Sequence, residues 1–290
     1  MTEKPTVAVL GLGAMGHAFA SNLLKHDFPT RVWNRNRARA EDLSGAQICD
    51  TPREAAEGAA VVITMLPDGE ITESVLIGAD GALAGAPKGA TIAQMGTIGV
   101  ESTTQLARTI DSTRPDIVFI DAPVSGTKGP AEQARIRILA SGDHAAASAI
   151  EPVFSAIASH TQWLGKVGAG SRMKLVVNAW LISMMQGLAE VARLAETFGF
   201  TTDDFWSALD GGPLATPYAK AKLDMIKDGR FEAQMALAWG LKDAGLALDV
   251  ANDIQMPALE RIREVWAEAV EAGLGELDIS AVYRRLGKHA

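Results

Sequence analysis

Short apolar runs alternate with amphipathic segments over the first half of the chain. Six runs have the length and composition of strands: Thr6–Leu10, Thr30–Trp33, Val61–Met65, Thr91–Gln94, Ile117–Ala122 and Ile136–Ser141. Helical patterns fill most of the gaps, at Met15–Lys25, Ala38–Leu43, Ile71–Leu76 and Ser102–Thr113. Alternation of this kind is typical of α/β domains. The pattern therefore predicts a parallel sheet with helical connections.

Strand patterns disappear after Gly168, and the remaining sequence has helical periodicity. One long helix without proline is predicted at Met173–Phe198. Further helices are predicted at Thr202–Leu209, Pro217–Asp228, Met235–Asp253 and Pro257–Ala272. We therefore expect an α/β domain over residues 1–165 and an all-α domain over residues 166–290.

The predicted long helix is apolar on several sides, as in VVNAWLISMMQGLAEVARLA. A helix that is apolar nearly all round must be buried nearly all round. The helical domain is too small to surround it alone, so we expect packing against a second subunit, in a homodimer or a tetramer. Burial inside one monomer is the alternative.

Composition and charge narrow the range of partners and compartments. The net charge of −8 argues against nucleic acid, since the one basic run is Asn34–Arg39. Cys49 is the single cysteine, which excludes an internal disulfide and is typical of a reducing compartment. No leader and no run near 18 uncharged apolar residues is evident, so we expect a cytoplasmic protein without a membrane segment. The five histidines lack ligand spacing, so no metal site is expected: His17, His26, His144, His160 and His289.

Three glycines follow the first predicted strand and open the first predicted helix, in the segment AVLGLGAMGHAF. Gly11 and Gly13 permit a tight turn and a close approach of backbone to phosphate, while Gly16 allows the helix to pack against the strand. The helix N-terminus adds unpaired N–H groups and a partial positive charge. A purely structural glycine turn is the alternative. We predict a Rossmann-type dinucleotide-binding domain, whose cradle comprises Gly11, Leu12, Gly13, Ala14, Met15 and Gly16.

The end of the second predicted strand indicates which dinucleotide is preferred. A carboxylate at this place binds the ribose 2′-OH of NAD, whereas arginine accommodates the 2′-phosphate of NADP. No acid occurs between Arg31 and Glu41, and Asn34, Arg35 and Arg37 occupy the position. We expect NADP(H) to be preferred over NAD(H), with Asn34 and Arg35 in the site. A solvated, basic helix start is the alternative.

Four stretches in a fixed order resemble one family over nearly the whole chain. They are GLGAMG at Gly11–Gly16, DAPVSGTKG at Asp121–Gly129, GKVGAGSRMKLVVN at Gly165–Asn178 and LKDAGLALDVA at Leu241–Ala251. The chain resembles the β-hydroxyacid dehydrogenase family, which includes 3-hydroxyisobutyrate dehydrogenases and glyoxylate/succinic semialdehyde reductases. This resemblance implies hydride transfer between a nicotinamide and a small β-hydroxyacid or its aldehyde or keto form.

Lys174 and Asn178 lie four residues apart on the predicted long helix, about 40° apart around its axis. They therefore share one face. The residues alone leave open whether Lys174 is a surface amine or a buried functional one. The family resemblance implies that Lys174 is the general acid and base, and that Asn178 holds the substrate or the lysine in position.

The resemblance also assigns binding residues. Ser125, Gly126 and Thr127 form a predicted turn after a strand, where backbone N–H groups and a hydroxyl can bind the carboxylate of the substrate. A structural turn is the alternative. Many family members have a second glycine where this chain has Thr127, which leaves the substrate's shape open. Positions along the cofactor cleft are matched by Leu66, Pro67, Thr97 and Lys242.

Two other functions remain as alternatives. Imine reductases and reductive aminases have an architecture similar to that of this family. They commonly have Asp or Tyr in place of the catalytic lysine, so Lys174 favours a carbonyl substrate. A non-catalytic, nucleotide-binding interaction module would fit better if Lys174 were missing. The sequence leaves open which hydroxyacid, aldehyde or imine is used, and in which direction.

Overall fold

The structure is a computed structural model that describes residues 4–252 and 254–287. The chain forms two compact units that divide between Lys174 and Leu175. The division falls inside one continuous helix, α8 (Ala169–Thr197), a few residues after the boundary expected from the sequence. Each unit is described by itself.

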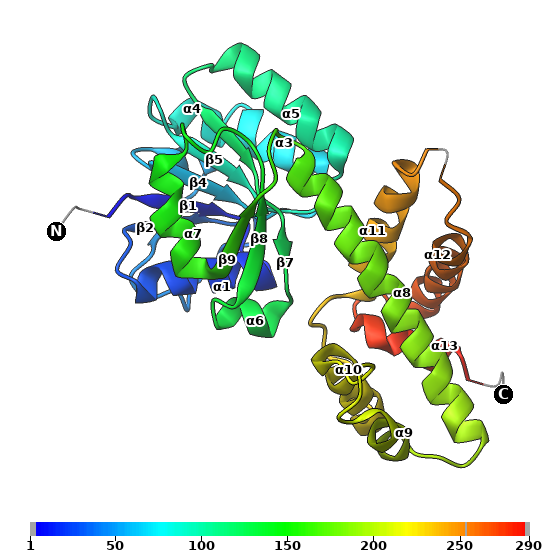
Figure 1. The fold of residues 1–290 in the computed structure, drawn as a ribbon. Helices are drawn as coiled ribbons and strands as arrows, with labels where there is room; N and C mark the ends of the chain where they lie inside the picture. Colours follow the sequence, from blue (N-terminus) through cyan, green and yellow to red (C-terminus); the bar gives the residue numbers. More distant parts are fainter. Residues whose placement is uncertain (1–3, 253, 288–290) are drawn as a thin grey trace. The chain divides into compact units, whose positions relative to one another are not determined.

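Six parallel strands form the main sheet of the first unit, in the order β3-β2-β1-β4-β5-β6 (Figure 1). The strands are β1 (Val7–Leu10), β2 (Thr30–Trp33), β3 (Gln47–Ile48), β4 (Val61–Thr64), β5 (Thr91–Gln94) and β6 (Val118–Asp121). The order reverses between β1 and β4, and in open α/β sheets ligands bind outside the carboxyl ends of strands at such a point. The predicted Rossmann-type fold is confirmed. Within this main sheet β3 alone was not predicted, because two residues show no periodicity.

A second sheet of three strands follows, in the order β7-β8-β9. Its strands are β7 (Val124–Ser125), β8 (Ile136–Ala140) and β9 (Ala158–Trp163). The run at Ile136–Ser141 is therefore a strand, but it belongs to this mixed sheet. Strand β7 was not predicted because it is too short to show a pattern, and β9 was not predicted because its sequence, ASHTQW, is largely polar and exposed.

Alternate residues of the central strands face two separate cores. Val7 and Val9 lie in one core and Ala8 and Leu10 in the other. Helices on both sides complete these cores: α1 (Ala14–Lys25), α6 (Lys128–Glu132) and α7 (Glu151–Ile157) on the first, and α2 (Pro52–Ala56), α3 (Gly69–Ile77), α4 (Ala82–Gly85) and α5 (Val100–Thr113) on the second. The helix predicted at Ala38–Leu43 is only a short 3-10 turn, Arg37–Ala40, begun by the side chain of Asn36.

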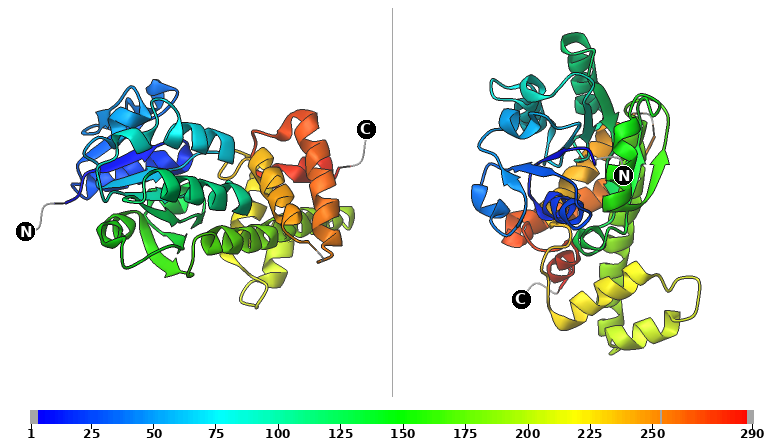
Figure 2. Two further views of the ribbon diagram at one scale, coloured as in Figure 1. Left: turned by 90° about the horizontal axis from the view of Figure 1, so that it is seen from above. Right: turned by 90° about the vertical axis from the view of Figure 1, so that its left-hand side faces the viewer.

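The described residues of the second unit form helices and connecting loops, with one isolated β-bridge between Ala236 and Asp278, and the unit contains most of α8. Its other helices are α9 (Thr202–Leu209), α10 (Pro217–Asp228), α11 (Leu237–Asp249), α12 (Pro257–Ala269) and α13 (Val282–Arg285). Helix α9 packs on α10, and α11 packs on α12 (Figure 2). The predicted ends of α9 and α10 are correct, whereas α12 ends at Ala269 because a wider turn with Gly273 at φ 85° follows. Asp253, the predicted end of α11, lies outside the described residues.

Helix α8 is long and apolar enough to cross a membrane by length and hydropathy, a criterion that the core helix of a soluble protein also meets. Polar residues interrupt the apolar sequence of α8, so a count of uninterrupted apolar residues does not detect this property. Two polar residues of α8 are buried with partners in the second unit: Asn178 donates to Asp243, and Gln186 accepts from Trp266. These contacts are those of a helix that packs against protein.

Candidate active site

The three glycines of the predicted cradle have three different environments. Gly11 has φ 98°, and a Cβ there would lie 2.5 Å from the carbonyl oxygen of Met65. A Cβ at Gly16 would overlap the carbonyl oxygen of Gly11. A Cβ at Gly13 would have no heavy atom within 4 Å. Gly11 and Gly16 are therefore required by the fold, whereas Gly13 leaves open space over the backbone, which a pyrophosphate needs in order to approach.

The first turn of α1 has the properties of an anion site. Its N-cap, Gly13, has no side chain that could accept from the helix N–H groups, and the first turn contains no acidic residue. The first intrahelical hydrogen bond is donated by His17 to Gly13. The N–H groups of residues 14–16 therefore remain available to a phosphate, and the helix dipole favours its negative charge. The residues present fit the phosphates of a dinucleotide.

Asn34 and the arginines follow β2, as predicted, but they differ in what they contact. The Asn34 side chain accepts from the N–H of Leu12 at 2.8 Å and donates to the carbonyl of Asn36 at 2.8 Å, so it holds the cradle loop. Arg35 is exposed and forms no ion pair among the described residues. Arg37 pairs with Asp50. This acid was not predicted because it follows β3, which lies beside β2 in the sheet.

The loops after β4 and β5 are tied to each other. A Cβ on Gly96 would overlap the carbonyl oxygen of Leu66, so the two chains approach closely there. The buried side chain of Gln94 exchanges two hydrogen bonds of 2.8 Å with the backbone of Gly96. Leu66, Pro67 and Thr97 are half-buried in these loops. The structure therefore places all three predicted cleft residues at the carboxyl ends of neighbouring strands.

The predicted substrate turn is a turn in the structure. Ser125 is half-buried at the end of β7, Gly126 is exposed with φ 135°, and Thr127 is the N-cap of α6. A Cβ on Gly126 would lie 2.7 Å from Cγ2 of Ile136 on β8. Glycine is needed here both for the backbone conformation and for the close contact.

Lys174 and Asn178 lie one turn apart on α8, and they differ in burial. Lys174 is half-buried, and Asn178 is 1% exposed. The Asn178 amide donates to Oδ2 of Asp243 at 2.6 Å. Asp243 is buried on α11, and its Oδ1 accepts no hydrogen bond from the described part of the chain but lies 3.3 Å from Nζ of Lys242. The structure thus joins two predicted residues, Asn178 and Lys242, through one carboxylate.

Asp243 and Asp121 are buried acids that were not predicted as site residues. The acid in the apolar sequence LKDAGLALD was a signal that Asp243 is buried with a partner. Asp121 is the last residue of β6 and accepts hydrogen bonds from the N–H groups of Gly168 and Ser171 at the start of α8. These residues lie 47 and 50 positions later in the sequence. No local pattern reveals a contact of that kind.

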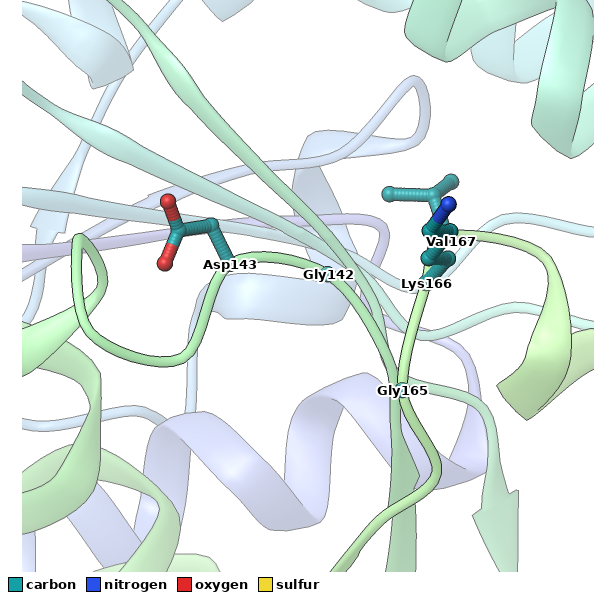
Figure 3. Close-up of a pocket in the computed structure, with 5 residues that line it drawn as sticks. All are labelled: Gly142, Asp143, Gly165, Lys166 and Val167. Atoms are coloured by element: carbon teal, nitrogen blue, oxygen red, sulfur yellow. The ribbon is translucent and has the colours of Figure 1, made fainter.

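The surface hollow in Figure 3 is lined by residues other than those of the candidate site. It has a volume of about 540 Å³ and is lined by Gly142, Asp143, Gly165, Lys166 and Val167. Asp143 and Lys166 lie on separate loops with their charged ends apart (Figure 3). It contains none of the predicted site residues. Within residues 4–252 and 254–287, no group of three or more His, Cys, Asp or Glu side chains could hold a metal ion.

Comparison with known proteins covers both units. Residues 6–165 match the family described as the NAD binding domain of 6-phosphogluconate dehydrogenase. Residues 168–286 match the family described as "NAD-binding of NADP-dependent 3-hydroxyisobutyrate dehydrogenase". The chain is 35% identical over 280 residues to glyoxylate/succinic semialdehyde reductase 1 of Arabidopsis thaliana, and the match covers 95% of this chain and 96% of the relative.

Solved structures show the same similarity. A 3-hydroxyisobutyrate dehydrogenase of Mycobacterium tuberculosis, solved with L-serine, is 26% identical with a TM-score of 0.85, over 98% of this chain and 99% of that one. An imine reductase from Pseudomonas sp. is 26% identical with a TM-score of 0.66, over 98% of this chain and 100% of that one. Since the two family matches extend from residue 6 to residue 286 and a reductase is similar over almost its full length, the chain belongs to the β-hydroxyacid dehydrogenase family and is an NAD(P)-dependent oxidoreductase.

Proposed function

We propose that this enzyme transfers a hydride between NADP(H) and a small carboxylated hydroxyacid or its aldehyde or keto form. The observation that carries the proposal is Lys174, a half-buried amine near the start of a mostly apolar helix, one turn before the buried Asn178. The similar proteins support the substrate class, since they include a reductase of glyoxylate and succinic semialdehyde and a dehydrogenase of 3-hydroxyisobutyrate.

In the proposed mechanism, Lys174 donates a proton to the carbonyl oxygen of the substrate during reduction and takes it back during oxidation. The nicotinamide cofactor, when bound, supplies or accepts the hydride. Asn178 is oriented by Asp243, so its amide can hold the substrate or the lysine at a fixed place. The turn Ser125–Thr127 offers backbone N–H groups and hydroxyls to the substrate carboxylate.

The cofactor would be held by the cradle and by the segment after β2. Residues 11–16 would bind the pyrophosphate through backbone N–H groups, while Leu66, Pro67, Thr97 and Lys242 would line the cleft. Arg35 would pair with the 2′-phosphate of NADP. The family match named for an NADP-dependent enzyme supports this preference.

Substitution of Arg35 tests the cofactor preference. We expect Arg35→Ala to weaken NADPH binding about tenfold or more and to leave NADH binding nearly unchanged. Only NADPH has the 2′-phosphate, with which Arg35 would form charge-assisted hydrogen bonds. Titration of each cofactor by fluorescence measures both affinities, and Arg108→Ala on α5 is a matched control. Equal affinity of the wild type for NADPH and NADH would contradict the preference.

An imine reductase on the same scaffold is the second candidate, since a solved imine reductase is among the similar structures. The interaction module is not proposed, because the chain is an oxidoreductase by family. Oxidation of NADPH with glyoxylate, succinic semialdehyde, tartronate semialdehyde, methylmalonate semialdehyde and a cyclic imine separates the candidates. We expect turnover of at least one carboxylated aldehyde to exceed that of the imine. Turnover of the imine alone would overturn the proposed substrate class.

We also propose that the enzyme is a homodimer or tetramer formed through α8. Five large apolar side chains on α8 are exposed and fall within about 60° around its axis at 3.6 residues per turn; they are Met173, Val176, Trp180, Val191 and Leu194. Exposure reaches 65% at Trp180 on the helix and 68% at Phe198, which directly follows its last residue. Exposed apolar side chains along one face over this length are typical of a surface that another subunit covers.

Light scattering tests this assembly. We expect the wild type at micromolar concentration to have at least twice the 30.6 kDa mass of one chain, and Trp180→Glu with Leu194→Glu to lower that mass, since two charges would be buried in the interface. Ser207→Glu on the exposed face of α9 is the control. A monodisperse wild type at the mass of one chain, with full activity, would contradict the proposal.

A further inference from the structure

Asp121 is a buried charged group that the proposed mechanism does not use. It is the last residue of β6 and is 0% exposed. Its Oδ2 accepts from the N–H of Gly168 at 3.1 Å, the N–H of Ser171 at 2.9 Å and the hydroxyl of Ser141 at 3.0 Å. Its Oδ1 accepts from the hydroxyl of Ser171 at 2.8 Å. Four donors thus converge on one carboxylate inside the first unit.

These contacts cap the start of α8 from a distant part of the chain. The first N–H groups of a helix have no partner within it. Asp121 supplies partners for two of them, and the hydroxyl of Ser141 accepts from a third, the N–H of Gly170, at 3.0 Å. Thr103 on α5 adds a hydroxyl contact of 3.1 Å to Ser171. The first turn of α8 is therefore held by side chains from β6, from α5 and from Ser141, the residue that follows β8.

The backbone segments around this cap are closely packed against each other. A Cβ on Gly170 would overlap the carbonyl oxygen of Leu139, so the start of α8 lies directly against β8. Asp121 and Ser141 also exchange backbone hydrogen bonds of 3.0 and 2.7 Å. Burial raises the pKa of the Asp121 carboxyl, and the hydrogen bonds from Ser171, Ser141 and Gly168 act against this rise. A buried carboxylate without such donors would strongly destabilise the fold.

The cap lies between the two parts of the site that must act on the same substrate. Ser171 precedes Lys174 by three residues, so the two are neighbours on the surface of one helix. On the other side, Asp121 leads within four residues to Ser125, the first residue of the predicted substrate turn. One carboxylate therefore connects the strand that leads into that turn with the helix that carries the lysine.

We propose that Asp121 is a positioning residue, which sets the place of the Lys174 amine relative to the substrate turn Ser125–Thr127. The inference rests on the proposed function, because it gives Asp121 an effect only through Lys174. A misplacement of about 1 Å in a reacting group can cost on the order of 10²-fold in rate. A carboxylate that served only stability would change the amount of folded enzyme and not the turnover of each folded molecule.

A double-mutant cycle tests this coupling. Asp121→Ala, Lys174→Ala and the double variant are compared with wild type in kcat and KM, with NADPH and the aldehyde of the panel above that wild type reduces fastest. We expect Asp121→Ala to lower kcat about 10- to 100-fold in the wild-type background and by less than about threefold in the Lys174→Ala background. The affinity for NADPH should stay within about twofold in all variants.

Conservative variants separate geometry from charge. In Asp121→Asn the amide oxygen can accept from Gly168 and Ser171, and its NH₂ group can donate to the Ser171 hydroxyl, which can reverse its role. We therefore expect Asp121→Asn to retain at least about a third of wild-type kcat. If Asp121→Ala does not fold, Ser171→Ala and Ser141→Ala replace it in the cycle, each with an expected loss of about 2- to 10-fold. Asp204→Ala removes a comparable cap from α9 and should leave kcat unchanged.

Two results would overturn the inference separately from the proposed function. An equal fold-loss from Asp121→Ala in both backgrounds would show that Asp121 acts independently of Lys174. A kcat as low in Asp121→Asn as in Asp121→Ala would show that its charge, and not the geometry of the cap, is what matters. Full activity of the Lys174→Ala variant would instead contradict the proposed function, in which Lys174 donates the proton.

Discussion

Substitution of Lys174 by alanine is expected to lower kcat for a carboxylated aldehyde by about 10²–10⁴-fold, with NADPH bound nearly as tightly as by wild type. The loss is that of a general acid, which stabilises the developing charge on the carbonyl oxygen only in the transition state. The cradle at Gly11–Gly16 is built from β1 and α1, so the substitution leaves its backbone donors in place. Steady-state kinetics and fluorescence titration of NADPH measure the two effects.

Lys174→Arg is the informative companion variant. Arginine keeps the positive charge, but its guanidinium stays protonated near pH 7 and has a different shape, so little activity should return. Arg172→Ala, two residues away and exposed, is the control for general damage to α8. Retention of more than about a third of wild-type turnover by Lys174→Ala, with chemistry rate-limiting, would show that another group supplies the proton.

Gly13→Val is expected to abolish cofactor binding without destabilising the fold. Gly13 has φ −67° and ψ −175°, a conformation that any residue adopts, and no atom lies within 4 Å of an added Cβ. The valine side chain would fill the space over the first turn of α1, where the pyrophosphate must approach the backbone. We expect NADPH affinity to fall by about 100-fold or more, since several charge-assisted hydrogen bonds are lost together.

The other glycines supply the comparisons for this prediction. Gly129→Val also adds its Cβ to open space, on α6, and should leave both NADPH affinity and Tm unchanged. Gly16→Ala should lower Tm clearly, because its Cβ would overlap the carbonyl oxygen of Gly11. Wild-type affinity for NADPH in Gly13→Val would show that the cofactor does not approach this turn.

Local chemistry explains which elements the sequence predicts well. Helix α9 begins after Thr201, whose side chain forms a capping box with Asp204, and α10 begins after Thr216 with Pro217 in its first turn. Such signals stand next to each other in the sequence, so both boundaries follow from it. Strands β3 and β7 have two residues each and exist because of their neighbours in a sheet. No window of sequence contains that information.

The same distinction applies to the site. The spacing of four predicts that Lys174 and Asn178 share one helical face, and the family resemblance implies their roles. The glycines of the cradle are found because strand, turn and helix are consecutive. The carboxylates of Asp121 and Asp243 act on residues that are 50 and 65 positions away, so their partners appear only in the folded chain. Asp50 escaped notice for the same reason.

The central claim is that Lys174 gives a proton to a carbonyl oxygen while the hydride is transferred. Single-turnover oxidation of bound NADPH by the fastest carboxylated aldehyde, with NADPH and with its deuterated form, measures this step directly in wild type and Lys174→Ala. The proposed mechanism predicts a rate at least about 100-fold lower in Lys174→Ala, with a deuterium isotope effect that shows hydride transfer to be limiting. An isotope-sensitive rate in Lys174→Ala above about a third of the wild-type rate would contradict it.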